Sequence, residues 1–192
     1  MITIPVKARD FTVKAKQLRR SGLVPGSVYG GPLTEDISLQ LDYAEVQKLV
    51  REKWKGSRIN LDLDGRIIPV QIKDADFDPL GRTMLDISFE ALKADVKVNS
   101  VVHILLKNVD KLPAPPERLL TEIPYDALPK DMIDTITLDL DGMPIGTIIT
   151  VADLPELQNE ALELQVPSDE IVLRILDKKR VGTDTSEDEE ET

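Results

Sequence analysis

The residues best suited to chemistry in this sequence are six basic side chains near its amino end, and the chemistry they suit is phosphate binding. They share their segment with one acid, Asp10, and are Lys7, Arg9, Lys14, Lys16, Arg19 and Arg20. A local excess of positive charge can bind nucleic acid even where the whole chain is acidic. A solvated helix face produces the same pattern, so charge alone leaves both interpretations open.

The net charge of −11 is distributed unevenly along the chain. Residues 1–91 hold 14 Lys and Arg against 13 Asp and Glu, whereas residues 92–180 hold 10 against 16. Residues 181–192 add six acids and no base. The excess negative charge therefore belongs to the second half and the tail, and it does not argue against nucleic-acid binding by the first half.

Residue types that support catalysis are scarce. The single histidine, His103, lies in an apolar strand pattern, and the chain has no cysteine for disulfides or thiolate metal sites. Paired carboxylates at two turns are too few for a good calcium site, so we interpret them as turn formers. These pairs are Asp62 with Asp64 and Asp139 with Asp141. We expect no enzyme, no cofactor, no metal and no small-molecule substrate.

The distribution of apolar residues bounds the class of protein. They make up 41% of the chain, which is enough for a buried core. No apolar stretch approaches the roughly 20 residues that span a bilayer, and the broken apolar run at residues 1–7 is too short for a signal peptide. We therefore expect a soluble, cytoplasmic protein without a membrane partner.

Period-two alternation of apolar residues predicts strands throughout the first half. The strand patterns cover residues 36–41, 59–63, 66–72 and 84–89. Asp64-Gly65 between two of them predicts a type I′ turn, because both residues accept positive φ. Pro69 has no amide donor, so we predict that its strand lies at a sheet edge or carries a bulge there. Leu85, Ile87 and Phe89 should share the buried face of the last strand.

Two short helices are predicted among these strands. The first covers residues 14–21 and ends at Gly22. Its one large apolar residue is Leu18, so it should lie on the surface with its basic side chains available to a partner. The second covers residues 43–51 and is capped by Asp42. Its core-facing residues at helical spacing are Tyr43, Val46, Leu49 and Val50.

The strand pattern restarts after residue 91, with turn-rich segments between strands. The further strands cover residues 96–106, 119–125, 136–140, 145–151, 161–166 and 171–176. The acidic run at residues 181–192 repels itself and should be disordered. The predicted fold is mainly β, with a domain at residues 1–91, an all-β domain at residues 92–180 and an acidic tail.

Several segments together resemble one known family. Residues 14–30, KAKQLRRSGLVPGSVYG, resemble the N-terminal signature of the bacterial ribosomal protein L25 and general stress protein CTC family. That signature is a basic helix, a glycine and an apolar-proline strand that ends in Tyr-Gly. The hairpin at residues 68–74 with Asp78-Pro79 matches the next block, and residues 128–154 continue the match. The resemblance runs in order over residues 2–178.

The resemblance implies a small N-terminal β-barrel that binds loop E of 5S rRNA, and the C-terminal β domain of longer members. It implies a structural role in the large ribosomal subunit, next to other large-subunit proteins. In such an interface, basic side chains hold phosphates while others read base edges across the wide minor groove of A-form RNA. The expected RNA-binding residues are Arg9, Lys14, Lys16, Arg19, Arg20, Tyr29, Lys73, Asp86 and Ser88. For Tyr29, packing as a strand aromatic is the alternative.

The chain departs from the family at two places in its first half, and a Gly-rich loop common early in the second domain is reduced to residues 107–113. Asp76-Phe77 stands where the family commonly has Gln-Arg, and residues 86–89 read Asp-Ile-Ser-Phe where it has His-apolar-Asp-Phe. One outward position therefore changes from cationic to anionic, which is unfavourable near phosphate unless the acid accepts from a base amine. The alternative function is a stress-related paralogue that acts as a protein-binding adaptor with weak or no RNA affinity.

Overall fold

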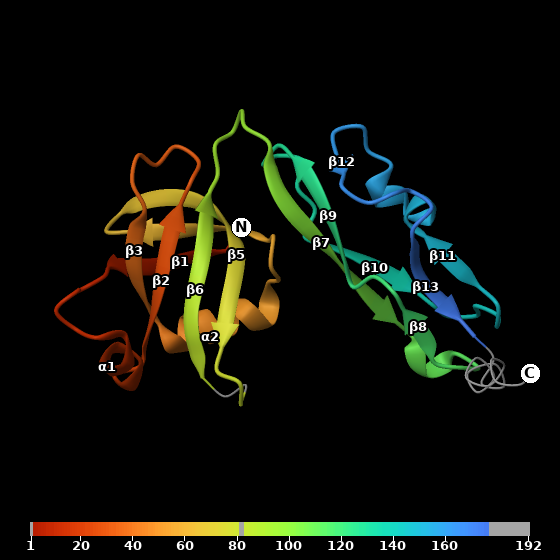
Figure 1. The fold of residues 1–192 in the computed structure, drawn as a ribbon, viewed down its shortest axis with the longest axis horizontal. Helices are drawn as coiled ribbons and strands as arrows, with labels where there is room; N and C mark the ends of the chain where they lie inside the picture. The colour runs from red at the N-terminus through yellow and green to blue at the C-terminus, as the bar shows by residue number, and fades with distance from the viewer. Residues whose placement is uncertain (1, 81–82, 177–192) are drawn as a thin grey trace, which may run out of the picture.

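The computed structural model describes residues 2–80 and 83–176, which form two β units joined by a short linker (Figure 1). The first unit is a barrel over residues 3–91, and the second is a pair of sheets over residues 98–175, called the C-terminal unit below. The mainly β fold with an N-terminal barrel is confirmed. The acidic tail that was predicted to be disordered lies outside the described residues.

Six strands close the barrel in the order β1-β3-β2-β6-β5-β4. They are β1 (Thr3–Ala8), β2 (Leu23–Tyr29), β3 (Ile37–Asp42), β4 (Arg58–Leu63), β5 (Arg66–Phe77) and β6 (Met84–Ala91). β1 with β4 and β2 with β6 pair in parallel, and the other neighbours are antiparallel. Alternate side chains fill the interior, among them Val28, Ile59 and Phe89, which are fully buried.

The β4–β5 hairpin turns as the sequence predicts. Asp64 has φ of 52° and Gly65 has φ of 88°, the two positive values of a type I′ turn. The Gly65 N–H donates to Oδ1 of Asp62 at 2.8 Å, so this carboxylate forms the turn. Asp139 has a similar role, because its Oδ1 accepts from the Asp141 N–H at 3.0 Å. The interpretation of both carboxylate pairs as turn formers is confirmed.

The prediction that Pro69 marks an edge or a bulge is wrong. β5 lies between β4 and β6 in the closed barrel, and its register irregularities fall later, after Ile72 and after Asp76. Pro69 pairs with Asn60 of β4, but the register with β6 begins only at Val70, so the missing donor falls just beyond the end of the pairing with β6. Its carbonyl still accepts from the Leu92 N–H at 2.8 Å.

The second irregularity changes which residue of β6 enters the core. Phe77 pairs with Met84 and Asp76 pairs with Asp86, so Leu85 is left without a partner in the register. Met84 is buried and Leu85 is half-buried, whereas Ile87 and Phe89 are fully buried as predicted. The prediction that Leu85 shares the buried face is therefore wrong, because a bulge interrupts the alternation.

Both predicted helices are present. α1 (Ala15–Arg20) buries only Leu18 among its residues and is followed by Gly22 with φ of 80°. α2 (Tyr43–Glu52) buries Val46 and Leu49. Oδ1 of its N-cap residue, Asp42, accepts from the backbone N–H groups of the first turn at 2.9 and 3.3 Å. Thus α1 lies on the surface, and α2 packs against the barrel core.

The C-terminal unit consists of two sheets with the orders β10-β7-β9-β12 and β11-β13-β8. The strands are β7 (Val98–Lys107), β8 (Pro116–Arg118), β9 (Glu122–Ala127), β10 (Thr135–Asp139), β11 (Ile148–Thr150), β12 (Glu163–Leu164) and β13 (Ile171–Ile175). Three 3₁₀ turns, η1 (Val109–Lys111), η2 (Val151–Asp153) and η3 (Pro155–Leu157), lie between strands. The sequence missed β8, which lies between the strands predicted at residues 96–106 and 119–125. The all-β character of this unit is confirmed.

Side chains bridge the barrel and the C-terminal unit at a contact that we call the junction. The bonded pairs are Lys53 Nζ with Asp134 Oδ2 (2.6 Å), Arg58 Nη1 with Pro129 O, Gln71 Nε2 with Asn99 O (2.9 Å), Lys73 Nζ with Asn99 O (3.0 Å) and Ser100 Oγ with Gly56 O (3.2 Å). Four of these five bonds end on a backbone carbonyl. They connect the β4–β5 face of the barrel to β7 and to the loop before β10.

Aromatic and backbone contacts complete the junction. The ring of His103 lies 5.4 Å from that of Trp54, and its Nε2 lies 3.1 Å from the carbonyl of Lys55. Gly56 has φ of 83°, and a Cβ at this position would lie 2.5 Å from the carbonyl oxygen of Val101. His103 is thus part of the contact between the two units. The division into independent domains near residue 91 stays a prediction.

Candidate nucleic-acid interface

α1 presents cationic side chains because it has only one residue with which to pack inward. Leu18 anchors it, and the guanidinium of Arg19 donates from Nη1 to the carbonyl of Leu85 in β6 at 3.1 Å. This bond fixes the end of α1 over β6. Lys16 and Arg20 are exposed, and so is Lys14 at the N-cap.

Arg9 lies at the end of β1, where its backbone N–H donates to the carbonyl of Ser38 at 3.0 Å. Its guanidinium carbon lies 5.6 Å from the centroid of the Phe11 ring, a cation–π distance. Phe11 is 76% exposed, so its ring is available to a base. Sequence reasoning missed Phe11, although an aromatic residue inside a basic run was the available signal.

Asp86 shows that these elements meet at one place. Its pKa is raised by burial and by the neighbouring charge of Asp76, while Arg9 and Arg19 act in the opposite direction. Arg9 from the end of β1, Arg19 from α1 and Asp86 from β6 are therefore close enough to interact electrostatically. Asp86 lies at the end of β6 over which α1 is fixed.

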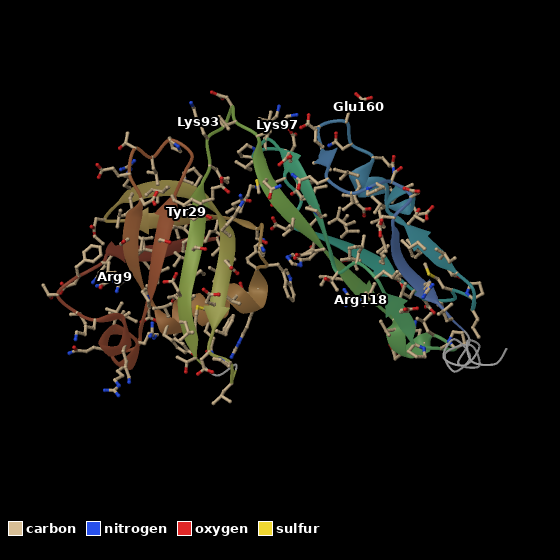
Figure 2. The ribbon with its side chains drawn as sticks, in the orientation of Figure 1. Arg9, Tyr29, Lys93, Lys97, Arg118 and Glu160 are labelled. Atoms are coloured by element: carbon tan, nitrogen blue, oxygen red, sulfur yellow. The ribbon has the colours of Figure 1, made fainter. Side chains whose placement is uncertain are left out.

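We call the cationic part of this region the basic surface and define it as Arg9, Lys14, Lys16, Arg19 and Arg20. Within residues 2–80 and 83–176, no ion pair neutralises any of its members. Nε of Arg9 is buried without an acceptor among the same residues. α1 lies on the side of the barrel away from the C-terminal unit, and Figure 2 shows Arg9 on that side. The basic surface therefore keeps its charge available to a partner.

The other expected contacts, Tyr29, Lys73 and Ser88, lie nearer the junction. Tyr29 pairs with Glu90 across β2 and β6, and Ser88 pairs with Ser27 on the same strands. Burial, followed by the charges of Glu90 and Asp74, raises the pKa of the Tyr29 phenol. Tyr29 is half-exposed. The structure therefore leaves both packing and contact with a partner open to it.

Lys73 differs from the members of the basic surface because its charge is already engaged. Its Nζ lies 2.8 Å from Oε2 of Glu90 and donates to the carbonyl of Asn99 at 3.0 Å. The structure thus gives Lys73 a role at the junction, which the sequence did not indicate. Any contact that it makes with RNA would have to share the ammonium group with these acceptors.

The barrel face formed by β2, β6 and β5 changes character along its length. Its α1 end carries the basic surface together with Asp86 and its strand partner Asp76, and its remaining length carries Asp74, Lys73 and Glu90. Residues 85–90 of β6 span roughly 17 Å along this face. A polyanion would be held at the α1 end, while carboxylates further along accept hydrogen bonds from amines.

The described part of the chain contains no group of three His, Asp or Glu residues placed to hold a metal ion. Among the same residues, no helix has both the length and the apolar composition needed to cross a membrane. The barrel face formed by β2, β6 and β5 itself carries both cations and carboxylates, with Asp86 beside Arg9 and Arg19 and with Glu90 beside Lys73.

Comparison with known proteins matches each unit to a family of ribosomal proteins. Residues 4–89 match the Ribosomal L25p family, and residues 97–179 match the family Ribosomal protein TL5, C-terminal domain. The chain is 29% identical over 181 residues to a large ribosomal subunit protein bL25 of Nitrosomonas europaea, covering 91% of each chain. It is 25% identical over 190 residues to the bL25 protein of Caldanaerobacter subterraneus, covering 97% of this chain and 94% of the relative.

Proposed function

Because the chain belongs to the ribosomal L25p family, a family of structural ribosomal proteins and not of enzymes, we propose that its barrel binds loop E of 5S rRNA within the large ribosomal subunit. The bacterial relatives are named as large-subunit proteins, which supports a ribosome-associated location in the cytoplasm and contacts with neighbouring large-subunit proteins. The barrel covers the residues that match the L25p model.

The observation that carries the proposal is the basic surface. It brings together side chains from the end of β1 and from α1, and among the described residues none of them is neutralised by an ion pair. Cations in this arrangement bind backbone phosphates and fix the protein's position on the RNA. Phe11, beside Arg9, adds an exposed aromatic face on which a base can stack.

Asp86 has a separate part in this proposal. Its side chain interacts electrostatically with Arg9 and Arg19, which bind phosphate, but its own ionised carboxylate repels phosphate. It therefore faces a base edge, where the carboxylate accepts a hydrogen bond from an exocyclic amine. Such a contact contributes to sequence preference, while the basic surface contributes affinity.

The test is a gel shift of the full-length protein with an RNA fragment that contains loop E, at low and at moderate salt. Arg19→Ala with Arg20→Ala should weaken binding by well over tenfold at moderate salt, because two phosphate contacts are lost. The matched control is Lys48→Ala with Arg51→Ala, which removes a lysine and an arginine from the exposed side of α2. Circular dichroism checks that Arg19→Ala leaves the fold intact, since Arg19 also bonds Leu85. Failure of the unaltered protein to bind the fragment at low salt would refute the proposal.

We further propose that residues 1–91 are a domain that retains this affinity when expressed alone. The alternative of a protein-binding adaptor without RNA affinity is not favoured by relatives that are named as ribosomal proteins. Sedimentation of the protein after cell lysis separates the two. Recovery with large subunits supports the ribosomal role, and recovery in the soluble fraction alone contradicts it.

A further inference from the structure

A groove of about 680 Å³ lies between the loop after α2 and the part of the C-terminal unit that is formed by the end of β7, η1 and β8. We call it the β7–β8 groove. The lining residues that the argument uses are Trp54, His103, Leu106, Val109, Pro116 and Arg118. Figure 2 shows Arg118 on the side of the C-terminal unit that faces the barrel. The groove is therefore separate from the basic surface, which lies on the other side of the barrel.

Most of the side chains that line the β7–β8 groove are apolar, and two of them are well exposed to solvent. Trp54 is 44% exposed and Val109 is 40% exposed. The ring of Trp54 lies 5.4 Å from the ring of His103, which supports it from one side. A supported aromatic side chain that lines an apolar groove is typical of the residues that contribute most to binding between proteins.

The main chain of β7 is unpaired where it borders this groove. β7 pairs with β10 as far as Lys107 but with β9 only as far as His103. The Ile104 N–H still donates to the carbonyl of Thr121 at 3.1 Å, on the β9 side. Hydrogen bonds of a strand point alternately to its two neighbours, so the N–H and C=O of Leu106 also point to that side. No strand of the described residues pairs with Leu106 there, which leaves a short sheet edge beside the groove.

The charge of the C-terminal unit restricts which partner fits. Residues 92–176 hold 7 Lys and Arg against 15 Asp and Glu, so the unit repels a polyanion and attracts cations. Asp110 follows Val109 in η1 and is exposed, and Oε2 of Glu122 lies 3.9 Å from Nδ1 of His103. Arg118 is a local cation, but its Nη2 donates to the carbonyl of Ile104 at 2.8 Å. Its other N–H groups can donate to the carbonyls of an incoming main chain.

We propose that the β7–β8 groove binds an extended, basic segment of a neighbouring protein, which pairs with the main chain of Leu106 and packs an apolar side chain against Trp54. Addition of a strand to a sheet edge derives affinity from main-chain bonds and specificity from the side-chain groove beside the edge. This inference goes beyond the proposed RNA binding, because it gives the C-terminal unit a protein partner of its own. The basic surface takes no part in it, so a failed gel shift with loop E would leave it standing.

Trp54 is the only tryptophan of the chain, so the tryptophan fluorescence of the full-length protein reports on this groove. The probe is an acetylated and amidated peptide, Lys-Val-Lys-Phe-Lys-Val-Lys, and its acidic counterpart has Glu in place of each Lys. We expect the basic peptide to shift the Trp54 emission to shorter wavelength, with an affinity about tenfold or more above that of the acidic peptide. The absence of a shift, or equal affinity for the two peptides, would overturn the inference.

Two other occupants of the groove give distinct results in the same assay. An emission shift with an oligouridine RNA but not with the basic peptide would assign the groove to nucleic acid. A shift that depends on protein concentration, in the absence of peptide, would assign it to a second copy of this chain. Either result would contradict the proposed partner.

Variants at exposed positions test the place of binding without disturbing the core. Val109→Lys puts a cation at the groove and should weaken binding of the basic peptide about tenfold or more. Ile148→Lys in β11 makes the same change of charge outside the groove, at a side chain that is 55% exposed, and should leave the affinity unchanged. Equal weakening in the two variants would show that only total charge matters and would refute the site.

Hydrogen exchange of the Leu106 amide tests the strand pairing itself. Saturation with the basic peptide should slow this exchange, because the N–H acquires an acceptor. The amide of Val102, which already pairs with Ile123 inside the sheet, is the reference and should be unaffected. An unchanged exchange rate at Leu106 in the saturated complex would refute the addition of a strand to β7.

Discussion

The salt dependence of RNA binding gives the sharpest test of the basic surface. Lys16→Ala with Arg20→Ala removes two exposed cations for which the described residues show no side-chain bond or ion pair. Surface changes of this kind alter folding stability by about 0.5 kcal/mol or less. The double variant therefore changes the charge that faces the RNA while the barrel stays folded.

The expected magnitude follows from the number of cations on the surface. Each phosphate contact contributes about 0.7–0.9 to the slope of log affinity against log salt, because counterions are released. With five contacts the slope is about −4, and affinity falls about 250-fold between about 50 and 200 mM salt. With three contacts it is about −2.4, and the fall is about thirtyfold. The slope of log affinity against log salt should thus be less steep in the variant by roughly 1.6.

Fluorescence anisotropy with a labelled loop E fragment, at several salt concentrations, measures this slope. The matched control, Lys48→Ala with Arg51→Ala, removes the same two residue types from α2 and should leave the slope unchanged. If the Lys16/Arg20 variant binds with the slope of the unaltered protein, those side chains do not contact phosphate. If the control loses as much slope, the effect is one of total charge and the basic surface has no special part in binding.

Three further predictions concern the barrel and the junction. Phe89→Ala should lower the free energy of unfolding by about 3–5 kcal/mol, because the ring is fully buried, whereas Ile67→Ala at an exposed position should cost far less in the same urea titration. Gly56→Ala should destabilise the protein more than Gly142→Ala. Both glycines have positive φ, but only a Cβ at Gly56 would contact β7, at 2.5 Å from the carbonyl oxygen of Val101. Equal urea midpoints for the two variants would refute the steric argument. The Asp86→Asn variant should be more stable than the unaltered protein at neutral pH. The pKa of Asp86 is raised in the folded state, so ionisation of this carboxyl lowers the free energy of unfolding. The advantage of the variant should disappear as the pH falls below 3.8, where the carboxyl is protonated in both the folded and the unfolded state. An advantage of Asp86→Asn that persists at low pH would show that charge is not its cause.

Local chemistry made part of this fold predictable. Asp64-Gly65 predicts its turn because the positive φ values are a property of these two residues. α1 was predictable as a surface helix because Leu18 is its only large apolar residue. The clustering of basic side chains was visible in the sequence, although their position beside β6 depends on the Arg19 bond to Leu85.

The features that the sequence did not predict depend on contacts between distant segments. The core position of Met84 in place of Leu85 follows from a bulge in the pairing of β5 with β6, which no local pattern shows. Gln71 alternates outward in its strand and would be exposed on an isolated barrel, but the C-terminal unit buries it at Asn99. The β7–β8 groove has walls from both units, so reasoning on either half alone could not find it.

The preference of the junction for main-chain acceptors bears on how the protein can evolve. Arg58, Gln71, Lys73 and Ser100 all donate to carbonyl oxygens, which every amino acid supplies. Residues on the accepting side other than Gly56, whose positive φ and close approach to β7 exclude a side chain, can therefore mutate with little effect on how the units are oriented, provided that the backbone keeps its path. Selection for a fixed geometry then acts on the few donor side chains, while the outward surfaces remain free to diverge.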